Sequence, residues 1–395
     1  MAVQKLRKDL YYVGAVDWDR RLFDELIPLP DGTSYNAYLI KGTDKTALID
    51  TVDPRKKQEL LDNLKELKIK SIDYVIANHA EQDHSGTLPD ILEHFPDAKI
   101  VTNSKCQSIL MDALRLPESR FKIIEDGEKL ALGKRTLEFI FTPWVHWPET
   151  MLTYLPEERI LFSCDFLGSH IASSSLYAED EPAIYRAAKR YFAEIMMPFR
   201  TQIKKHLVKL AALEIELIAP SHGPLYNRPD FILDAYKDWT SDAVKNEVVV
   251  PYVSMWGSTQ KMVSYFIDAL ITRGVTVKPF HLTATDIGEL AMALVDAATI
   301  VLGSPTVLTG PHPLVAYATI LANALRPKTR YASIIGSYAW GGKMVEQLAA
   351  MIPHLKVEIL DPVIAKGYPK NSDFQALDKL ADKIVANHKA LGIYS

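Results

Sequence analysis

Cysteine is scarce in this 395-residue chain, which contains only Cys106 and Cys164. Two cysteines supply neither a disulfide scaffold nor a site with four thiolate ligands for iron or zinc. No apolar run reaches the length of a membrane span, and the N-terminal residues lack the apolar core of a signal peptide. These absences predict a cytoplasmic protein that does not act at a membrane.

An excess of one charge is also missing, because 45 Lys and Arg residues stand against 49 Asp and Glu residues. The sequence has no basic patch of the size that nucleic-acid binding requires, so we expect no nucleic-acid partner. Hydrophobic residues make up 48% of the chain, which is typical of a globular protein. A chain of this length suits two domains, and we expect them to span residues 1–245 and 246–395.

Side chains able to bind a metal ion follow four apolar strands that we predict in residues 1–245. The densest group is the stretch NHAEQDHSG, residues 78–86, which continues the predicted strand IDYVIAN. Further candidates follow the strands in LEFIFTPWVHWPE, RILFSCDFLGS and IELIAPSHGP. Because strand ends converge at one edge of a sheet, we expect seven residues to meet there: His79, Glu81, Asp83, His84, His146, Asp165 and His222.

Four histidines and three carboxylates are too many for one metal ion and suit two, with Asp165 as the bridging ligand. Histidine combined with carboxylate favours a redox-active iron pair over zinc, and a di-zinc hydrolase that uses a metal-bound hydroxide is the alternative. We expect Cys164 to point away from the metals, because side chains alternate along a strand. His170 follows Asp165 closely enough to support the site without binding metal.

Residues 246–395 alternate apolar strands with helical stretches, which predicts a doubly wound parallel sheet with helices on both faces. The first strand ends in SMWGST, a loop that offers backbone N–H groups and hydroxyls to a phosphate at the start of a helix. The loop has neither the lysine of a Walker loop nor the glycine spacing of a dinucleotide site. It suits a monophosphate such as that of FMN.

Two further loops, in VLGSPTVLTG and IIGSYAWGG, follow later strands and should wall the same crevice. Trp256 and Trp340 are predicted to flank the flavin ring. The residues predicted to bind FMN are Ser254, Met255, Trp256, Gly257, Ser258, Thr259, Pro305, Thr306, Val307, Leu308, Ser337, Tyr338, Ala339, Trp340, Gly341 and Gly342.

Stretches along nearly the whole chain, taken together, resemble the flavodiiron protein family. They include VGAVDW, TSYNAYLI, NHAEQDHSG, LGKRTLEF, HWPE, SCDFLGSHIA, APSHG, SMWGST, GSPT and WGG. The resemblance implies an α/β chain that joins a metallo-β-lactamase-like αββα sandwich to a flavodoxin-like domain with a doubly wound parallel sheet. It also implies that Asp165 bridges two iron ions, whose other ligands are His79, Glu81 and His146 on one ion and Asp83, His84 and His222 on the other.

The resemblance further implies a reductase of dioxygen, of nitric oxide, or of both, in which FMN relays electrons to the di-iron centre. It implies a head-to-tail homodimer or a tetramer that takes electrons from rubredoxin or from a reduced deazaflavin. The sequence has no pair of Cys-x-x-Cys motifs for a rubredoxin module of its own, so we expect a separate electron donor.

Three stretches depart from the family pattern. Asp24 stands in RLFDEL where members often have a histidine, and Phe192 follows Tyr191 where many have a second tyrosine. Residues 307–309 (VLT) replace asparagines that are common after GSPT. We therefore expect a changed polarity near the metals and changed contacts to the flavin, with every proposed metal ligand still present.

Overall fold

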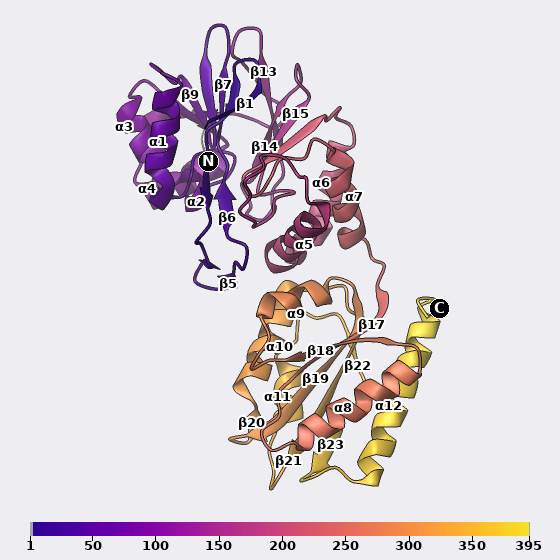
Figure 1. The fold of residues 1–395 in the computed structure, drawn as a ribbon. Coiled ribbons are helices and arrows are strands. Elements are labelled where there is room, and N and C mark those ends of the chain that lie inside the picture. Colours follow the sequence, from indigo (N-terminus) through magenta and orange to yellow (C-terminus); the bar gives the residue numbers. More distant parts are fainter. Residues whose placement is uncertain (1–2, 395) are drawn as a thin grey trace. The chain divides into compact units, whose positions relative to one another are not determined.

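The computed structural model describes residues 3–394, and the chain divides into two units (Figure 1). The first unit runs to Phe192 and from Phe199 to Thr240, and the second contains Ala193–Pro198 and the chain from Ser241 onward. The strand β17 (Lys245–Tyr252) spans the boundary expected between residues 245 and 246, and that boundary stays a prediction.

The first unit contains two sheets that face each other (Figure 1). The first sheet consists, in spatial order, of β1 (Gln4–Arg7), β2 (Leu10–Tyr12), β7 (Tyr38–Lys41), β8 (Thr46–Ile49), β9 (Tyr74–Ile76), β10 (Lys99–Thr102) and β11 (Phe121–Ile123). The second sheet consists of β12 (Lys129–Ala131), β13 (Thr136–Phe141), β14 (Met151–Leu155), β15 (Ile160–Cys164) and β16 (Leu217–Pro220). Two short antiparallel pairs join β3 (Ala15–Asp17) to β6 (Thr33–Tyr35) and β4 (Leu22–Phe23) to β5 (Ile27–Pro28).

Both faces of the first sheet are buried, because successive side chains of a strand point to opposite sides. Ile40 of β7 and Ile49 of β8 belong to the core between the sheets, together with Phe162 of β15. Leu39 and Leu48, the alternate residues of the same strands, belong to a separate core that includes residues of the helices. This arrangement confirms the predicted αββα sandwich.

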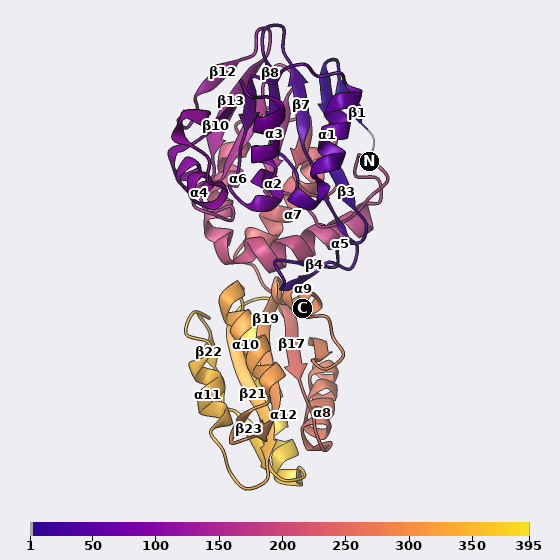
Figure 2. The same ribbon diagram turned by 90° about the vertical axis from the view of Figure 1, so that its left-hand side faces the viewer.

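Helices cover the outer faces of the two sheets (Figures 1 and 2). The helices packed on the first sheet are α1 (Lys57–Glu66), α3 (Leu88–His94) and α4 (Ser104–Leu114). The helices over the second sheet are α5 (Glu181–Tyr191), α6 (Arg200–Leu210) and α7 (Pro229–Thr240). Asp53 accepts a hydrogen bond from the backbone N–H of Arg55 (2.9 Å) and so caps the 3₁₀ turn Pro54–Lys56 that leads into α1.

The second unit is built on a parallel sheet with the order β18-β17-β19-β21-β22. Its remaining strands are β18 (Thr276–His281), β19 (Ala297–Val307), β21 (Tyr331–Tyr338), β22 (Glu358–Ile359) and β23 (Val363–Lys366), the last of which also pairs with β21. A short β20 (Gly310–Pro311) folds back on β19. The second strand in sequence lies outside the first, which is the order of flavodoxin-like sheets and confirms the predicted class.

Helices lie on both faces of this sheet. They are α8 (Ser258–Thr272), α9 (Ile287–Leu294), α10 (Pro313–Leu325), α11 (Met344–Ala350) and α12 (Asn371–Ala390). Helix α8 packs beside α12, while α9 packs beside α10. Among residues 3–394, no helix combines the length and the apolar character needed to cross a membrane.

Candidate functional site

The seven predicted metal ligands lie together at one edge of the sandwich. His79, His146, Asp165 and His222 follow strands β9, β13, β15 and β16 in turn, as the sequence predicts. The other three are Glu81, Asp83 and His84, which occupy the short helix α2 (Gln82–Ser85) and the residue that precedes it. The ligand atoms form two groups, each with members within 4.8 Å of one another.

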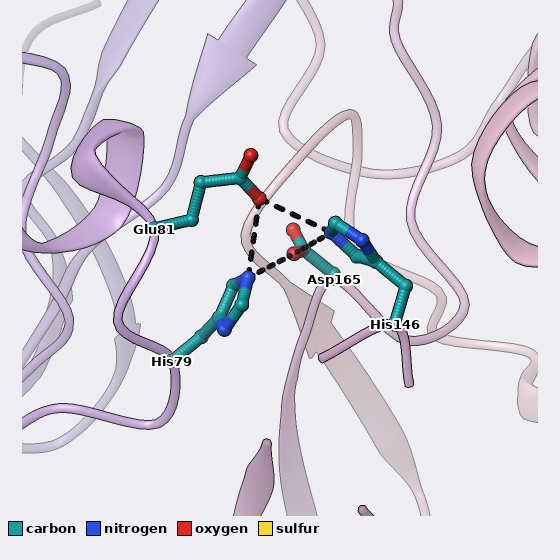
Figure 3. Close-up of side chains that lie close together, drawn as sticks. All are labelled: His79, Glu81, His146 and Asp165. Carbon is teal, nitrogen blue, oxygen red and sulfur yellow. Dashed lines mark hydrogen bonds and ion pairs between the residues drawn. The ribbon is translucent and has the colours of Figure 1, made fainter. Parts of the chain in front are cut away.

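The first group surrounds one carboxylate oxygen of Glu81 (Figure 3). The Nε2 atoms of His79 and His146 each lie 3.1 Å from Glu81 Oε2. The same two nitrogens each lie 3.4 Å from Asp165 Oδ2. Two imidazoles and two carboxylates therefore converge on one point.

The second group lies on the other side of Asp165. Asp83 places one oxygen 3.1 Å from His222 Nε2 and the other 3.3 Å from His84 Nε2. Asp165 Oδ1 lies 2.8 Å from His84 Nε2 and 3.4 Å from His222 Nε2. Asp165 therefore presents one oxygen to each group, which is the arrangement of a carboxylate that bridges two cations.

The buried polar atoms of this cluster fit a pair of metal ions. Both carboxylate oxygens of Asp83 and of Asp165 are buried, and among the described residues they face imidazole nitrogens without forming a hydrogen bond of regular geometry. Burial would raise the pKa of Asp165, but the facing histidines, led by His84, hold it well below its usual range. Burial lowers the pKa of His84, but Asp165 and Asp83 raise it to about 10. The buried carboxylates thus favour positive charge beside them, and imidazole with carboxylate is a donor set that suits iron.

Two residues outside the predicted set hold the histidine rings in position. Glu149, whose side chain is fully buried, lies with Oε1 2.7 Å from His79 Nδ1 and accepts the backbone N–H of Ala80. The carbonyl of Ser34 lies 2.6 Å from His222 Nδ1. Such bonds fix the tautomer that leaves Nε2 for a metal. Sequence reasoning missed Glu149, although the stretch HWPE places it three residues after His146.

His170 lies against the second group, in the supporting position that the sequence suggests. Its ring centroid is 4.6 Å from that of His222, and its Nδ1 is 2.9 Å from Thr33 Oγ1. Tyr191 packs on the same imidazole with a centroid distance of 4.8 Å. Phe192, by contrast, packs on Tyr236 and Trp239, so the departure at this position falls in the core of α5 and α7.

Asp24 lines a cleft that leads to the metal ligands. The cleft has a volume of about 460 Å³ and is lined by Arg20, Phe23, Asp24, Asp53, Pro54, Arg55, Glu81, Gln82, Asp83 and Trp147. Partial burial, together with the charges of Glu81 and Asp83, raises the pKa of Asp24 to about 6. The departure from the family pattern therefore places a carboxyl group, rather than an imidazole, at the entrance to the site.

The expected orientation of Cys164 is wrong. Its Sγ lies within 4.8 Å of a ring nitrogen of His84 and of a carboxylate oxygen of Asp165. The alternation of side chains fails here because Cys164 leaves the extended conformation, with a φ of +49°.

The second unit carries a cleft at the carboxyl ends of its strands. Its volume is about 200 Å³, and it is lined by Ser254, Met255, Trp256, Ser258, Thr259, Pro305, Thr306, Ser337, Tyr338, Ala339 and Gly367. Ten of these residues belong to the set predicted from sequence, and Gly367 was not foreseen. The other predicted residues, which do not line it, are Gly257, Val307, Leu308, Trp340, Gly341 and Gly342.

This cleft fits the phosphate end of FMN. Helix α8 begins at its edge, where its N-cap residue Gly257 has no side chain to cap it. The hydroxyl of Ser254 accepts the N–H of Gln260 (3.1 Å), so the N–H groups left for an anion are those of Ser258 and Thr259. The hydroxyls of Thr259 and Ser337 lie 3.1 Å apart in the cleft and add donors. Trp256 is 90% exposed beside them and offers a large apolar surface to a planar ring.

Comparison with known proteins gives consistent matches over the chain. Residues 33–223 match the family model described as ODP family beta lactamase. The nitric oxide reductase of Moorella thermoacetica is 37% identical over 387 residues, which are 95% of this chain and 96% of that protein. The coenzyme F420H2 oxidase of Methanothermobacter marburgensis is 34% identical over 97% of this chain and 99% of its own length.

Solved structures match over the same extent. The rubredoxin oxygen:oxidoreductase of Desulfovibrio gigas superposes with a TM-score of 0.94 at 32% identity, covering 98% of this chain and 99% of that chain. The flavodiiron protein of Giardia intestinalis superposes with a TM-score of 0.91 at 28% identity, covering 99% of this chain and 97% of that one.

Proposed function

Because this chain belongs to the flavodiiron protein family of oxidoreductases, we propose that it reduces dioxygen to water, nitric oxide to nitrous oxide, or both. The observation that supports this most directly is the position of Asp165, whose two oxygens face separate groups of ligands. A bridged pair of cations suits a diatomic substrate, because both of its atoms, or two molecules of it, can be held at once.

The proposed ligands of one iron are His79, Glu81 and His146, those of the other are Asp83, His84 and His222, and Asp165 binds both. When bound, an iron pair supplies two electrons and a reduced flavin supplies two more, which together are the four that dioxygen needs. The protein's part is to hold the ligands rigidly: Glu149 fixes His79 and the Ser34 carbonyl fixes His222.

The cleft that leads to the ligands suits a small uncharged substrate. Phe23, Pro54 and Trp147 give it apolar walls, while Arg20 and Asp24 make it polar at other points. A diatomic gas needs no hydrogen bond to enter such a cleft, so selection between dioxygen and nitric oxide falls to the contacts made beside the metals.

FMN is proposed to occupy the cleft of the second unit, with its phosphate at the start of α8. The names of two relatives identify a coenzyme F420H2 oxidase and a rubredoxin oxygen:oxidoreductase. We propose by analogy that a separate rubredoxin or a reduced deazaflavin supplies the electrons, and that the chain works as a head-to-tail homodimer or a tetramer.

Elemental analysis and an absorption spectrum of the purified protein test the proposal. We expect about two irons and one FMN for each chain, because each site of the structure takes one such group. Two zinc ions and no flavin would instead indicate the hydrolase alternative. Anaerobic stopped-flow mixing of the reduced protein with dioxygen and with nitric oxide then identifies the substrate by the rate of flavin reoxidation.

A further inference from the structure

Cys164 lies beside the metal ligands and has no part in the proposed function. It is the last residue of β15, it precedes Asp165, and it is 1% exposed. Its Sγ forms a compact set with a ring nitrogen of His84 and a carboxylate oxygen of Asp165, all within 4.8 Å of one another. Three atoms at such separations can bind one metal ion.

His84 supplies a second and independent reason to infer a ligand here. This residue is 2% exposed, and both of its ring nitrogens are buried with no hydrogen-bond partner among the described residues. The nearby carboxylate of Asp50 is already engaged by the backbone N–H and the side-chain amide of Asn78, both at 2.9 Å. The buried polar atoms without a hydrogen-bond partner thus belong to the imidazole of His84 and to the carboxylate of Asp165.

The backbone at Cys164 is unfavourable for a residue that has a Cβ atom. Its φ of +49° falls in the left-handed region, where glycine is the easy choice. A thiol is therefore held next to the cluster despite a backbone that glycine would fit better. Strain of this kind at a functional centre points to a use for the side chain.

We propose that His84, Cys164 and Asp165 form an alternative, thiolate-containing ligand set that binds a thiophilic divalent cation, namely Zn²⁺. Thiolate, imidazole and carboxylate are all ligands of zinc, and three protein ligands leave a fourth position open. Binding forms a Zn–S bond in place of the S–H bond, and the thiol proton leaves to solvent. Iron(II), a harder ion, gains less from the thiolate.

This set shares His84 and Asp165 with the proposed iron ligands, so the inference rests on the proposed function for their identity. A zinc ion on the thiolate set and an iron ion on Asp83, His84 and His222 require the same imidazole. Zinc therefore competes with iron for the second position, and Cys164 sets how strongly it competes.

Cobalt(II) titration of the metal-free, full-length protein tests the proposal, because a thiolate bound to Co²⁺ gives an intense charge-transfer band in the near ultraviolet. We expect this band in the wild type and its loss in Cys164→Ser. The matched control is Cys106→Ser, which removes the other buried thiol, located on α4 away from the grouped ligand atoms. That variant should keep the band, and added Zn²⁺ should abolish it.

The apparent affinity for Co²⁺ at this position should fall at least about tenfold in Cys164→Ser. Cys164→Gly serves as a second variant, because glycine suits the positive φ and keeps the fold while removing the thiol. A wild type without the band, or a band that persists in either Cys164 variant, would overturn the proposal. Iron and FMN contents of the iron-loaded wild type test the proposed function separately, so the two failures are distinguishable.

Discussion

Asp165 is the residue that both groups of metal-ligand candidates share. We expect Asp165→Ala to lose iron and reductase activity, because each group loses one of its two carboxylates and the pair loses the carboxylate that the two groups share. FMN should remain at one per chain, since its cleft belongs to the other unit. Metal and flavin analysis measures both, with the exposed Asp97→Ala as the control. Loss of both cofactors together would contradict the assignment of the two sites to separate units.

Glu149 would influence the proposed metals through His79, whose Nδ1 lies 2.7 Å from Glu149 Oε1. We expect Glu149→Gln to lower metal affinity by about 10- to 100-fold, because a neutral amide orients the imidazole less firmly and makes it a poorer ligand. Competition of the protein with a chelator for Co²⁺ measures this change. Glu138→Gln, at a partly exposed position that pairs with Lys129, should leave the affinity unchanged. An unchanged affinity in Glu149→Gln would show that the contact is only structural.

The ligands themselves were predictable because each follows an apolar strand, and strand ends meet at one edge of a sheet. Glu149 was not, because nothing local shows that it will reach a histidine 70 positions earlier in the sequence. Cys164 was predicted wrongly because the rule of alternation assumes an extended backbone, and this residue has a φ of +49°. The sequence therefore predicts which metal-ligand candidates meet at the edge of the sheet. Irregular backbone conformations, which the sequence pattern does not show, decide which further residues lie beside those ligands.

At the scale of the element, the start of helix α8 depends on Gly257, which has a φ of +85°. We expect Gly257→Ala to weaken FMN binding by about 1 kcal/mol, or roughly fivefold, because the strained residue shifts the first N–H groups of the helix. Fluorescence titration of the flavin-free protein with FMN measures the affinity. Gly127→Ala is a matched control, because that residue also has a positive φ (+80°) and open space at its Cβ but lies in the other unit. Equal losses of FMN affinity in the two variants would contradict the proposed phosphate site.

Helix α12 is held to the sheet through a buried histidine. His388 is fully buried, with Nε2 2.8 Å from Thr299 Oγ1 and Nδ1 2.8 Å from Asn246 Oδ1. Burial lowers its pKa from 6.5 to about 4, so between these values the unfolded chain binds the proton that the folded chain refuses. Stability should therefore fall as the pH drops from about 6.5 towards 4, by at most about 3 kcal/mol.

Urea denaturation at pH 7 and pH 5, followed by circular dichroism, measures this effect as a difference between variants. The wild type and the exposed His354→Asn should lose stability at the lower pH, whereas His388→Asn should lose less. The same pH dependence in all three proteins would mean that other groups cause it.

The elements of the second unit were predictable from their alternation, but the lining of its cleft was only partly so. The three expected loops supply ten of its residues, because loops at the carboxyl ends of parallel strands wall a crevice. Gly367 joins them from the turn after β23, where the sequence KGYP carries no signal for a ligand. Leu308 and Trp340 were also predicted to line the cleft, but they lie further along two of the loops and are 93% and 77% exposed. The sequence could not predict this, because the composition of a loop does not determine its path.

At the scale of the whole molecule, the two proposed sites belong to separate units of the chain, so the proposed electron transfer connects one unit with another. In the proposed head-to-tail dimer, the flavin of one copy would serve the metals of the other copy. Two inactive variants would then restore each other. Asp165→Ala removes the metals, and Ser258→Asp places a negative charge at the start of α8, which suits the helix but repels the phosphate of FMN.

We expect each variant alone to be nearly inactive and the co-expressed mixture to recover about a quarter of the wild-type rate per chain. Random pairing makes about half of the dimers mixed, and each mixed dimer joins one intact flavin cleft to one intact metal site. If electrons instead passed within a single chain, no species in the mixture would contain both intact sites in one copy, and the rate would stay at the level of the separate variants. Differently tagged chains allow the mixed species to be purified and its rate measured directly. An inactive mixed dimer that retains one FMN and two irons would therefore refute transfer between copies.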